Sequence, residues 1–218
     1  MSVLAIDGPA GAGKSTVARE VARRLGWQYL DTGAMYRTVA LAALRAGMIE
    51  EGPDALGSLA RSLDISLDDG CVRLDEEDVT MRIREEDVTA AAAIVAAHAP
   101  VRAALLPLQR KVLAGGEVVI EGRDIGVTVA PDAPVKVFLT ASPQERARRR
   151  GAQLGVEDHE ELERLAHSIK HRDTSDSTRA ASPLALAEDA IIVDTTGMSL
   201  DDTVSEVLHL VSKAIGRG

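Results

Sequence analysis

The sequence predicts an α/β fold in which a five-stranded parallel sheet lies between layers of helices and carries a small antiparallel insert. Three observations lead to this prediction. Short apolar runs, typical of strands covered on both faces, alternate with helical patterns along most of the chain. A glycine-rich loop joins the first apolar run to the first helix. Between residues 63 and 84, apolar and polar residues alternate one by one instead, as they do in antiparallel strands.

The parallel strands are expected where apolar runs are bounded by turns, at 3–6, 27–30, 117–122, 135–140 and 190–195. The first helix follows the glycine loop and ends at Leu25, because Gly26 is a typical helix-terminating residue. The remaining helices are expected at 34–47, 53–62, 85–98, 100–113, 143–154, 158–171 and 200–215. Residues 31–33 are expected to form a turn, which would place Arg37 in the first turn of the helix after it.

Individual residues justify several of these helix starts. Pro100 suits a first turn, where its missing N–H is not needed. Asp158 and Glu161 have the spacing of a capping box, and Ser199 is a typical N-cap. The insert is expected to contain two or three short strands, and Asp69-Gly70 marks a turn between two of them.

Length and composition restrict the class of protein. A chain of 218 residues, 45% hydrophobic and 27% charged, is expected to form a single globular domain. The net charge of −9 argues against broad binding to nucleic acid or to an anionic membrane. The single cysteine, Cys71, permits no internal disulfide. The stretch MSVLAIDG has neither the basic start nor the long apolar run expected of a signal peptide, and no later run approaches about 18 apolar residues. We therefore expect a soluble cytoplasmic protein.

The stretch IDGPAGAGKSTVARE, residues 6–20, contains the pattern G-x-x-x-x-G-K-[ST]. In such a loop, backbone N–H groups converge on a phosphate chain, Lys14 supplies a cation and the Ser15 hydroxyl binds Mg²⁺. The alternative is a glycine-rich turn that closes onto a helix by chance. The complete pattern between a strand and a helix favours nucleotide binding.

The class of nucleotide-binding protein is narrowed by what the sequence lacks. A regulatory GTPase needs a guanine-reading Asn-Lys-x-Asp loop, and the sequence contains no asparagine. A motor or transport ATPase needs large coupled domains, for which 218 residues leave little chain. A small-molecule kinase needs only a second pocket and a closing lid.

Several arginines lie at the ends of predicted strands or helices, where α/β sheets bind ligands. They are Arg37, Arg102, Arg123, Arg172 and Arg179. Guanidinium groups suit phosphate oxygens, although Arg123 could instead pair with Asp124 and Arg102 could lie on a solvated helix face. The segment ERARRR contains a cluster of four arginines: Arg146, Arg148, Arg149 and Arg150. The cluster is either a basic solvated helix face or part of a lid over the phosphates, and the sequence does not assign a role to any single one of them.

Taken together, the motifs resemble those of bacterial cytidylate kinases. They occur in the order and at the spacings of that family over nearly the whole chain: GPAGAGKST, LDTGAMYR, EGRDIG, PDAPVKVFLTAS-x-x-ERARRR and RDTSDSTRAASPL. The resemblance implies a three-layer P-loop kinase fold. Its core would comprise about 1–35 and 110–218, with a monophosphate-binding insert at about 36–105 and a lid at about 145–172.

The resemblance also implies a reaction, which is transfer of the γ-phosphoryl group of ATP to CMP or dCMP with Mg²⁺ as the metal. Lys14, Arg123 and Arg172 would be catalytic, and Ser15 would bind the metal. The ATP phosphates would be held by Gly8, Pro9, Ala10, Gly11, Ala12, Gly13, Lys14, Ser15 and Thr16. The acceptor nucleotide would be held by Thr32, Tyr36, Arg37, Arg102, Arg123, Asp124, Arg172, Asp176 and Arg179.

One residue departs from the family pattern. The family often has a nucleotide-contacting serine before PVRAALL, and Ala93 stands at the equivalent spacing here, so a hydroxyl contact would be missing. We expect a monomer whose partners are the small molecules CMP and dCMP, with no nucleic acid and no membrane. Two alternatives stay open: a P-loop kinase for UMP, AMP or a non-nucleotide metabolite, and an ATP-binding module without transfer activity.

Overall fold

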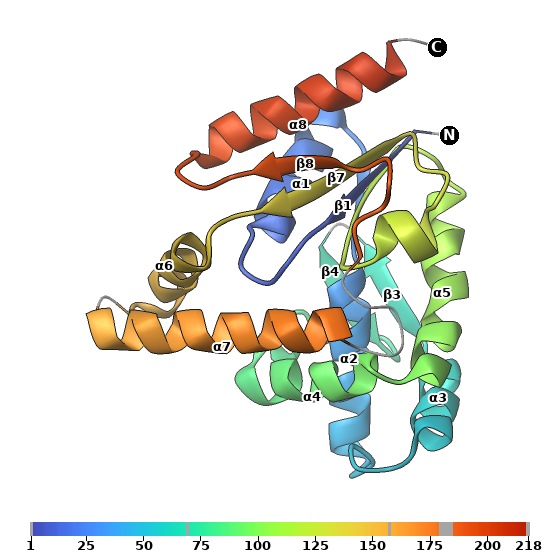
Figure 1. Cartoon of the computed structure of the whole chain (residues 1–218). Coiled ribbons are helices and arrows are strands. Elements are labelled where there is room, and N and C mark those ends of the chain that lie inside the picture. Colours follow the sequence, from blue (N-terminus) through green and yellow to red (C-terminus); the bar gives the residue numbers. More distant parts are fainter. Residues whose placement is uncertain (1, 69, 157, 179–184, 217–218) are drawn as a thin grey trace.

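A computed structural model of the chain describes residues 2–68, 70–156, 158–178 and 185–216. At 153, 171, 172 and 174–178 it describes the backbone alone. Two sheets and the helices around them make up the fold (Figure 1).

The larger sheet has five parallel strands in the order β2-β6-β1-β7-β8. The strands are β1 (Val3–Asp7), β2 (Gln28–Asp31), β6 (Val118–Glu121), β7 (Val135–Thr140) and β8 (Ile191–Asp194). All five lie within one or two residues of the predicted runs, so the predicted parallel sheet is confirmed. Because the strands are parallel, their carboxyl ends meet at one edge, and the loops that follow them lie side by side there.

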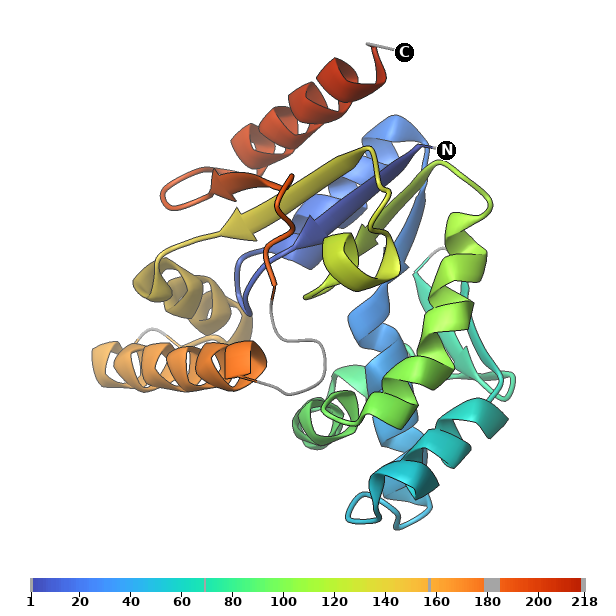
Figure 2. The same cartoon turned by 45° about the vertical axis from the view of Figure 1, so that its right-hand side comes forward.

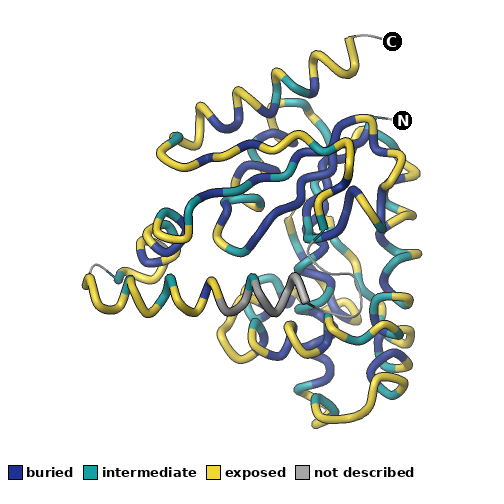
Figure 3. Tube along the Cα trace, viewed as in Figure 1, coloured by how far each residue is buried: buried dark blue, intermediate teal, exposed yellow. Residues whose placement is uncertain are grey.

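Helices cover both faces of this sheet. Leu4 and Ile6 of β1 pack with α1 (Lys14–Leu25) and α8 (Leu200–Ile215), whereas Val3 and Ala5 pack with the cluster on the opposite face. That cluster includes residues of α2 (Thr32–Arg45), α5 (Ala99–Leu113) and η2 (Ile125–Val129). Strand residues that alternate between two cores are what a three-layer arrangement requires. The central strands β1, β6 and β7 are largely buried, whereas the edge strand β8 is largely exposed (Figure 3).

The insert is a three-stranded antiparallel sheet in the order β3-β4-β5, as predicted for residues 63–84. Its elements and neighbours are β3 (Ile65–Asp68), β4 (Cys71–Leu74), β5 (Glu77–Asp78), η1 (Arg82–Arg84), α3 (Pro53–Ser62) and α4 (Glu86–Ala96). In Figure 2, the small sheet and α2 to α5 lie on one side of the large sheet's carboxyl edge. On the other side lie α6 (Pro143–Leu154) and α7 (His159–Thr178).

The structure corrects three local predictions. Residues 32 and 33 belong to α2 rather than to a turn, because the Asp31 side chain caps the helix by accepting the N–H of Ala34 at 2.9 Å. Arg37 therefore lies in the second turn of α2. Helix α7 continues to Thr178 instead of ending at 171, and the π-helical turn η2 was not predicted.

The predicted N-caps of two helices are confirmed. Ser199 Oγ accepts the N–H of Asp202 at the start of α8, at 3.1 Å. Asp158 Oδ1 accepts the N–H of Glu161 at the start of α7, at 3.0 Å. Both caps satisfy donors that the helix itself cannot pair.

Within the described part of the chain, no single helix combines the length and apolarity needed to cross a bilayer. Helices α4 and α5 meet that criterion only together, as a pair bent by 100°.

Candidate active site

The loop between β1 and α1 is shaped by glycines. Gly8, Gly11 and Gly13 have φ angles of 146°, 76° and 87°, in the range that other residues rarely adopt. At Gly8 a Cβ atom would lie 2.0 Å from the carbonyl oxygen of Leu139, so only glycine fits there without moving β7. Gly13 is the N-cap of α1, and the N-terminus of that helix points its N–H groups toward the loop.

Two cationic side chains reach this loop from different parts of the chain. Lys14 Nζ donates to the carbonyl oxygen of Pro9 at 2.9 Å. Arg123, which follows β6, donates from Nη1 to the carbonyl oxygen of Gly8, also at 2.9 Å. The arginine thus lies at the carboxyl edge beside the glycine loop, where its position in the sequence predicted it.

Asp7, the last residue of β1, is a buried carboxylate that the sequence reasoning missed. Its oxygens accept the backbone N–H groups of Ile125 and Gly126, each at 2.8 Å. Burial raises the pKa of Asp7 to about 6, although the two N–H groups oppose the shift. The available signal was its place at the end of a central strand, directly before the loop.

Glu121, the last residue of β6, is a second buried carboxylate that was missed. The Tyr29 hydroxyl donates to its Oε1 at 2.5 Å. Burial and the nearby Asp31 raise the pKa of Glu121, and Lys14 and hydrogen bonds from Tyr29 and Ser15 oppose the shift. Carboxylate and hydroxyl oxygens thus meet beside the start of α1, which is the donor chemistry that Mg²⁺ prefers.

On the insert side of the edge, Arg37 is held by an acid. Its Nη2 lies 2.8 Å from Asp31 Oδ2, with both side chains largely buried. Its Nε is also buried and has no hydrogen-bond partner among the described residues. A buried guanidinium with an unused donor is suited to receive an anion.

Arg102 has the same arrangement. It forms a buried ion pair with Asp124, at 2.7 Å between Nη2 and Oδ2, and its guanidinium lies 5.3 Å from the centre of the Tyr36 ring. Its Nε, too, is buried without a partner in the described part of the chain. The alternative of a solvated helix face for Arg102 is therefore wrong, and so is the alternative that Asp124 pairs with Arg123, because Asp124 pairs with Arg102. Thr32 donates nearby to the carbonyl oxygen of Glu121 at 2.7 Å.

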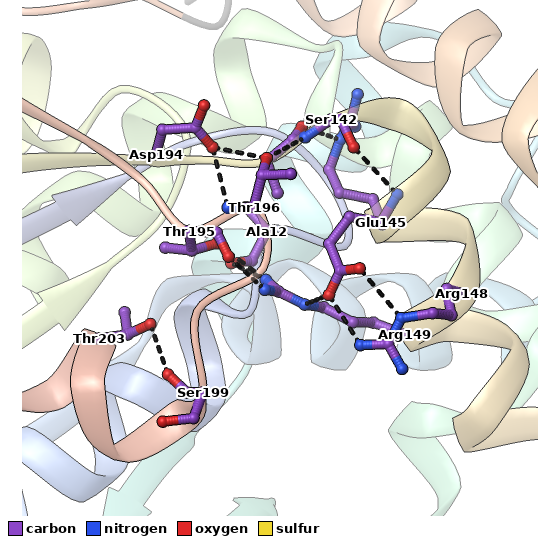
Figure 4. A network of polar contacts seen from close by, with 12 residues as sticks. Ala12, Ser142, Glu145, Arg148, Arg149, Asp194, Thr195, Thr196, Ser199 and Thr203 are labelled. Atoms are coloured by element: carbon purple, nitrogen blue, oxygen red, sulfur yellow. Dashed lines mark hydrogen bonds and ion pairs between the residues drawn. The ribbon is translucent and has the colours of Figure 1, made fainter.

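The four arginines of α6 differ in their surroundings, and Figure 4 shows two of them, Arg148 and Arg149. Arg146 is buried and donates to the carbonyl oxygen of Ala10 at 3.0 Å and to Asp173 of α7 at 2.5 Å. Arg149 donates to the carbonyl oxygen of Ala12 at 3.4 Å and twice to Thr195. The exposed Arg148 pairs with Glu145, and Arg150 is also exposed. Two arginines of the cluster therefore contact the glycine loop, a distinction that the sequence alone did not provide.

Four further residues named in the sequence analysis lie elsewhere or cannot be placed. The backbones of Arg172 and Asp176 belong to α7, but their side chains lie outside the described part of the structure, as does the whole of Arg179. Ala93 is exposed on α4. Among the residues that the structure describes, no group of three or more His, Cys, Asp or Glu side chains could hold a metal ion.

Comparison with known proteins agrees with this geometry. Residues 4–213 match the model of a family described as cytidylate kinase. A cytidylate kinase from Mycobacterium leprae is 48% identical over 216 residues, which cover 98% of this chain and 97% of that protein. One from Carboxydothermus hydrogenoformans is 46% identical over 215 residues, covering 96% of this chain and 97% of that protein.

The fold is also found in a solved structure with little sequence similarity. A gluconokinase from Sinorhizobium meliloti superposes with a TM-score of 0.51 at 16% identity, covering 99% of this chain and 94% of that one. At this identity the similarity shows the fold alone.

Proposed function

The chain belongs to the cytidylate kinase family, and on that premise we propose that it transfers the γ-phosphoryl group of ATP to CMP or dCMP. The products are ADP and CDP or dCDP. One observation carries the proposal: Lys14 and Arg123 donate to adjacent carbonyl groups of the same glycine loop. Cations from the ATP side and from the acceptor side thus converge where the two anionic substrates have to meet.

On the ATP side, the loop from Gly8 to Thr16 holds the phosphates through its backbone N–H groups and the N-terminus of α1. In the structure, Lys14 Nζ lies on a loop carbonyl. On ATP binding it exchanges that weak acceptor for phosphate oxygens, because a charge-assisted hydrogen bond is roughly twice as strong as one to a neutral acceptor.

On the acceptor side, Arg37 and Arg123 bind the monophosphate group. The unpartnered Nε atoms of Arg37 and Arg102 supply donors that are already buried. Thr32, Tyr36, Arg102 and Asp124 surround the base and ribose, together with Arg172, Asp176 and Arg179. Cytosine presents a 4-amino donor where uracil presents an acceptor, so a carboxylate or hydroxyl acceptor in this pocket favours cytosine.

The chemical step needs alignment and charge neutralisation more than proton transfer. An oxygen of the CMP phosphate, already anionic, attacks the γ-phosphorus as the bond to the β-phosphate oxygen breaks. Lys14, Arg123 and Arg172 stabilise the charge that develops on the transferred group. No general base is required, because the attacking oxygen carries no proton.

Mg²⁺ would be held by the Ser15 hydroxyl, and its chemistry is to neutralise charge on the β- and γ-phosphates. The oxygen groups around Ser15 fit such an ion, because the Ser15 hydroxyl donates to the buried carboxylate of Glu121 and keeps its lone pairs for the metal. Glu121 thereby fixes the orientation of the hydroxyl.

In the proposed enzyme, helices α6 and α7 form the lid over the ATP phosphates. Arg146 and Arg149 contact carbonyl groups of Ala10 and Ala12, so the lid and the loop already touch. The phosphates of ATP are stronger acceptors than these carbonyls, and the lid arginines would close onto them. We place the enzyme in the cytoplasm as a monomer.

A panel of acceptors tests the proposal directly. The purified chain is incubated with ATP, Mg²⁺ and one acceptor at a time, namely CMP, dCMP, UMP, AMP or gluconate, and ADP release is measured. We expect release that depends on CMP or dCMP. Preferential use of another acceptor would reassign the substrate, and tight ATP binding that is indifferent to every acceptor would indicate an ATP-binding module.

Ala93 predicts a limit on selectivity within that panel. The missing hydroxyl on α4 removes one contact to the acceptor nucleotide. We therefore expect Ala93→Ser to strengthen CMP or dCMP binding by a few-fold, the scale of one neutral hydrogen bond, without changing the reaction.

A further inference from the structure

Asp7 joins the end of β1 to the segment that follows β6. It is 5% exposed, and both of its carboxylate oxygens are used by backbone donors of η2, Ile125 N–H on Oδ1 and Gly126 N–H on Oδ2. The carboxylate therefore spans two segments that are 118 residues apart in the sequence.

The segment that Asp7 holds directly follows two proposed substrate-binding residues, Arg123 and Asp124. It is a single π-helical turn, closed by the N–H of Ala130 on the carbonyl oxygen of Ile125 at 2.8 Å. The first N–H groups of such a turn have no acceptor within it. Asp7 accepts two of them and so fixes where the turn begins, and π turns occur frequently at functional sites.

A second bond runs in the opposite direction between the same two segments. Arg123 donates to the carbonyl oxygen of Gly8, the residue after Asp7. Two consecutive residues at the start of the phosphate loop thus bind the segment 123–126, one as a side-chain acceptor and one as a backbone acceptor. Asp124, between the two contacts, holds Arg102.

The environment of Asp7 opposes its negative charge. Burial, with a smaller contribution from the neighbouring Asp124, raises the pKa of Asp7 to about 6. Lys14 on α1 and the two N–H groups of η2 act against the shift. From β7, the aliphatic part of Lys136 lies against Gly126. Carboxylates in such surroundings are frequent at functional sites, which favours a functional role for Asp7 over a purely stabilising one.

We propose that Asp7 is a positioning residue for phosphoryl transfer: through η2 it fixes Arg123 and Asp124 relative to the phosphate loop, and thereby aligns the acceptor nucleotide with ATP. Asp7 touches neither substrate and acts through the backbone. The inference rests on the proposed function, because it assumes that Arg123 and Asp124 bind the acceptor. If the inference is right, a change at Asp7 weakens the binding of the acceptor nucleotide and slows phosphoryl transfer, while ATP binding is largely kept.

The test compares Asp7→Ala, Asp7→Asn and Asp189→Asn with the parent protein. Asp7→Ala removes both acceptors, whereas Asp7→Asn keeps one oxygen and the shape of the side chain. Asp189→Asn is the matched control: it removes one negative charge near the same turn, where Asp189 binds Lys136 at 2.7 Å and contacts no N–H of η2. Steady-state kinetics give kcat and both KM values, and calorimetry gives the Kd of CMP and, separately, of adenylyl imidodiphosphate.

For Asp7→Ala we expect kcat with CMP to fall about 100-fold, the scale of a misplacement of about 1 Å at a reacting centre. The Kd of CMP should rise about 10-fold, the scale of one lost charge-assisted hydrogen bond, while that of adenylyl imidodiphosphate changes less than about 3-fold. Asp7→Asn should lie between Asp7→Ala and the parent, and Asp189→Asn should match the parent. Thermal unfolding checks that each variant is folded. If Asp7→Ala does not fold, the comparison is made with Asp7→Asn alone.

Two results would overturn the inference. One is a folded Asp7→Ala or Asp7→Asn with parental kinetics toward CMP. The other is an equal loss in the binding of CMP and adenylyl imidodiphosphate, which would indicate general loosening of the fold. Failure of the proposed function looks different, because the parent protein itself would then not phosphorylate CMP or dCMP.

Discussion

Carboxylates at the carboxyl edge of the large sheet and carboxylates on the outer helices respond to their surroundings in opposite directions. At the edge, burial raises the pKa of Asp7 to about 6 and also raises that of Glu121. On the outer surface, hydrogen bonds from arginines lower the pKa of Glu20 and of Asp87 to about 2. The surroundings of the surface acids favour the charged carboxylate, whereas the surroundings of the edge acids disfavour it.

The difference shows how this chain distributes its charges. Exposed ion pairs such as Arg82–Asp87 are solvated and contribute little to stability, however short they are. The buried acids at the edge each connect segments that are distant in the sequence, such as β1 with η2 and β2 with β6. Changes at the edge should therefore alter catalysis, and changes on the surface should alter very little.

The largest effect is expected at Lys14, the cation of the glycine loop. Lys14→Ala should leave the fold largely intact and weaken the transition state by about 3 kcal/mol or more, the scale of losing one charge-stabilising donor. Steady-state kinetics with CMP check this, with the exposed Lys111→Ala as control. Turnover of CMP at the parental rate would contradict the role of Lys14.

The next effect concerns stability and pH. The folded protein holds a proton on Asp7 up to a pKa of about 6, against an ordinary value of 3.8, so this group's contribution to stability is complete below about pH 4 and is lost as pH rises to about 6. The free energy of unfolding of the parent, relative to Asp7→Asn, should therefore fall by about 3 kcal/mol between pH 3 and pH 8, with most of the fall between pH 4 and pH 6. Denaturant titrations at several pH values measure this, and parallel curves would mean that Asp7 titrates normally.

A smaller and more selective effect is expected at Arg123. Arg123→Ala should reduce kcat/KM for CMP by about 10-fold to 100-fold, the scale of one hydrogen bond between charged groups, while ATP binding changes far less. Separate calorimetric titrations with CMP and adenylyl imidodiphosphate distinguish the two sites. Arg61→Ala, on the exposed side of α3, is the control. An equal loss at both sites would remove Arg123 from the acceptor side.

The smallest effect is expected for a surface pair. Arg45 and Glu77 are 2.7 Å apart, yet both side chains are about half exposed. Arg45→Ala should lower the Tm by less than about 3 °C and leave kcat/KM for CMP unchanged. A clear loss of activity would show that the contrast between edge and surface is incomplete.

Much of the fold could be predicted from the sequence because its signals are local. The apolar runs at 3–6 and 135–140 identify covered strands, and the change of period at 63–84 identifies the antiparallel insert. The start of α2 could not be predicted correctly, since whether Asp31 ends a strand, forms a turn or caps a helix depends on where its side chain points. The turn η2 was missed because its donors are satisfied by Asp7, far away in the sequence.

The site was predictable in its residue types but not in its pairings. The glycine pattern identified the phosphate loop, and strand ends identified Arg37 and Arg123. Which arginine pairs with which acid depends on tertiary contacts, so Asp124 was considered beside Arg123 although it binds Arg102. Asp7 and Glu121 stand inside quoted motifs, but those motifs do not show which groups the two carboxylates contact, and these contacts emerge only when neighbouring strands are placed side by side.

Helix α7 contains 20 residues, which makes it about 30 Å long. Its first turn is fixed by the Asp158 cap, and in the same turn Leu162 lies against Gly151 of α6. A rod of this length acts as a lever, and a tilt of about 10° at its first turn would displace its last turn by about 5 Å. A modest pivot between α6 and α7 is thus enough to carry the backbone of Arg172 and Asp176 across a distance comparable to the width of a nucleobase.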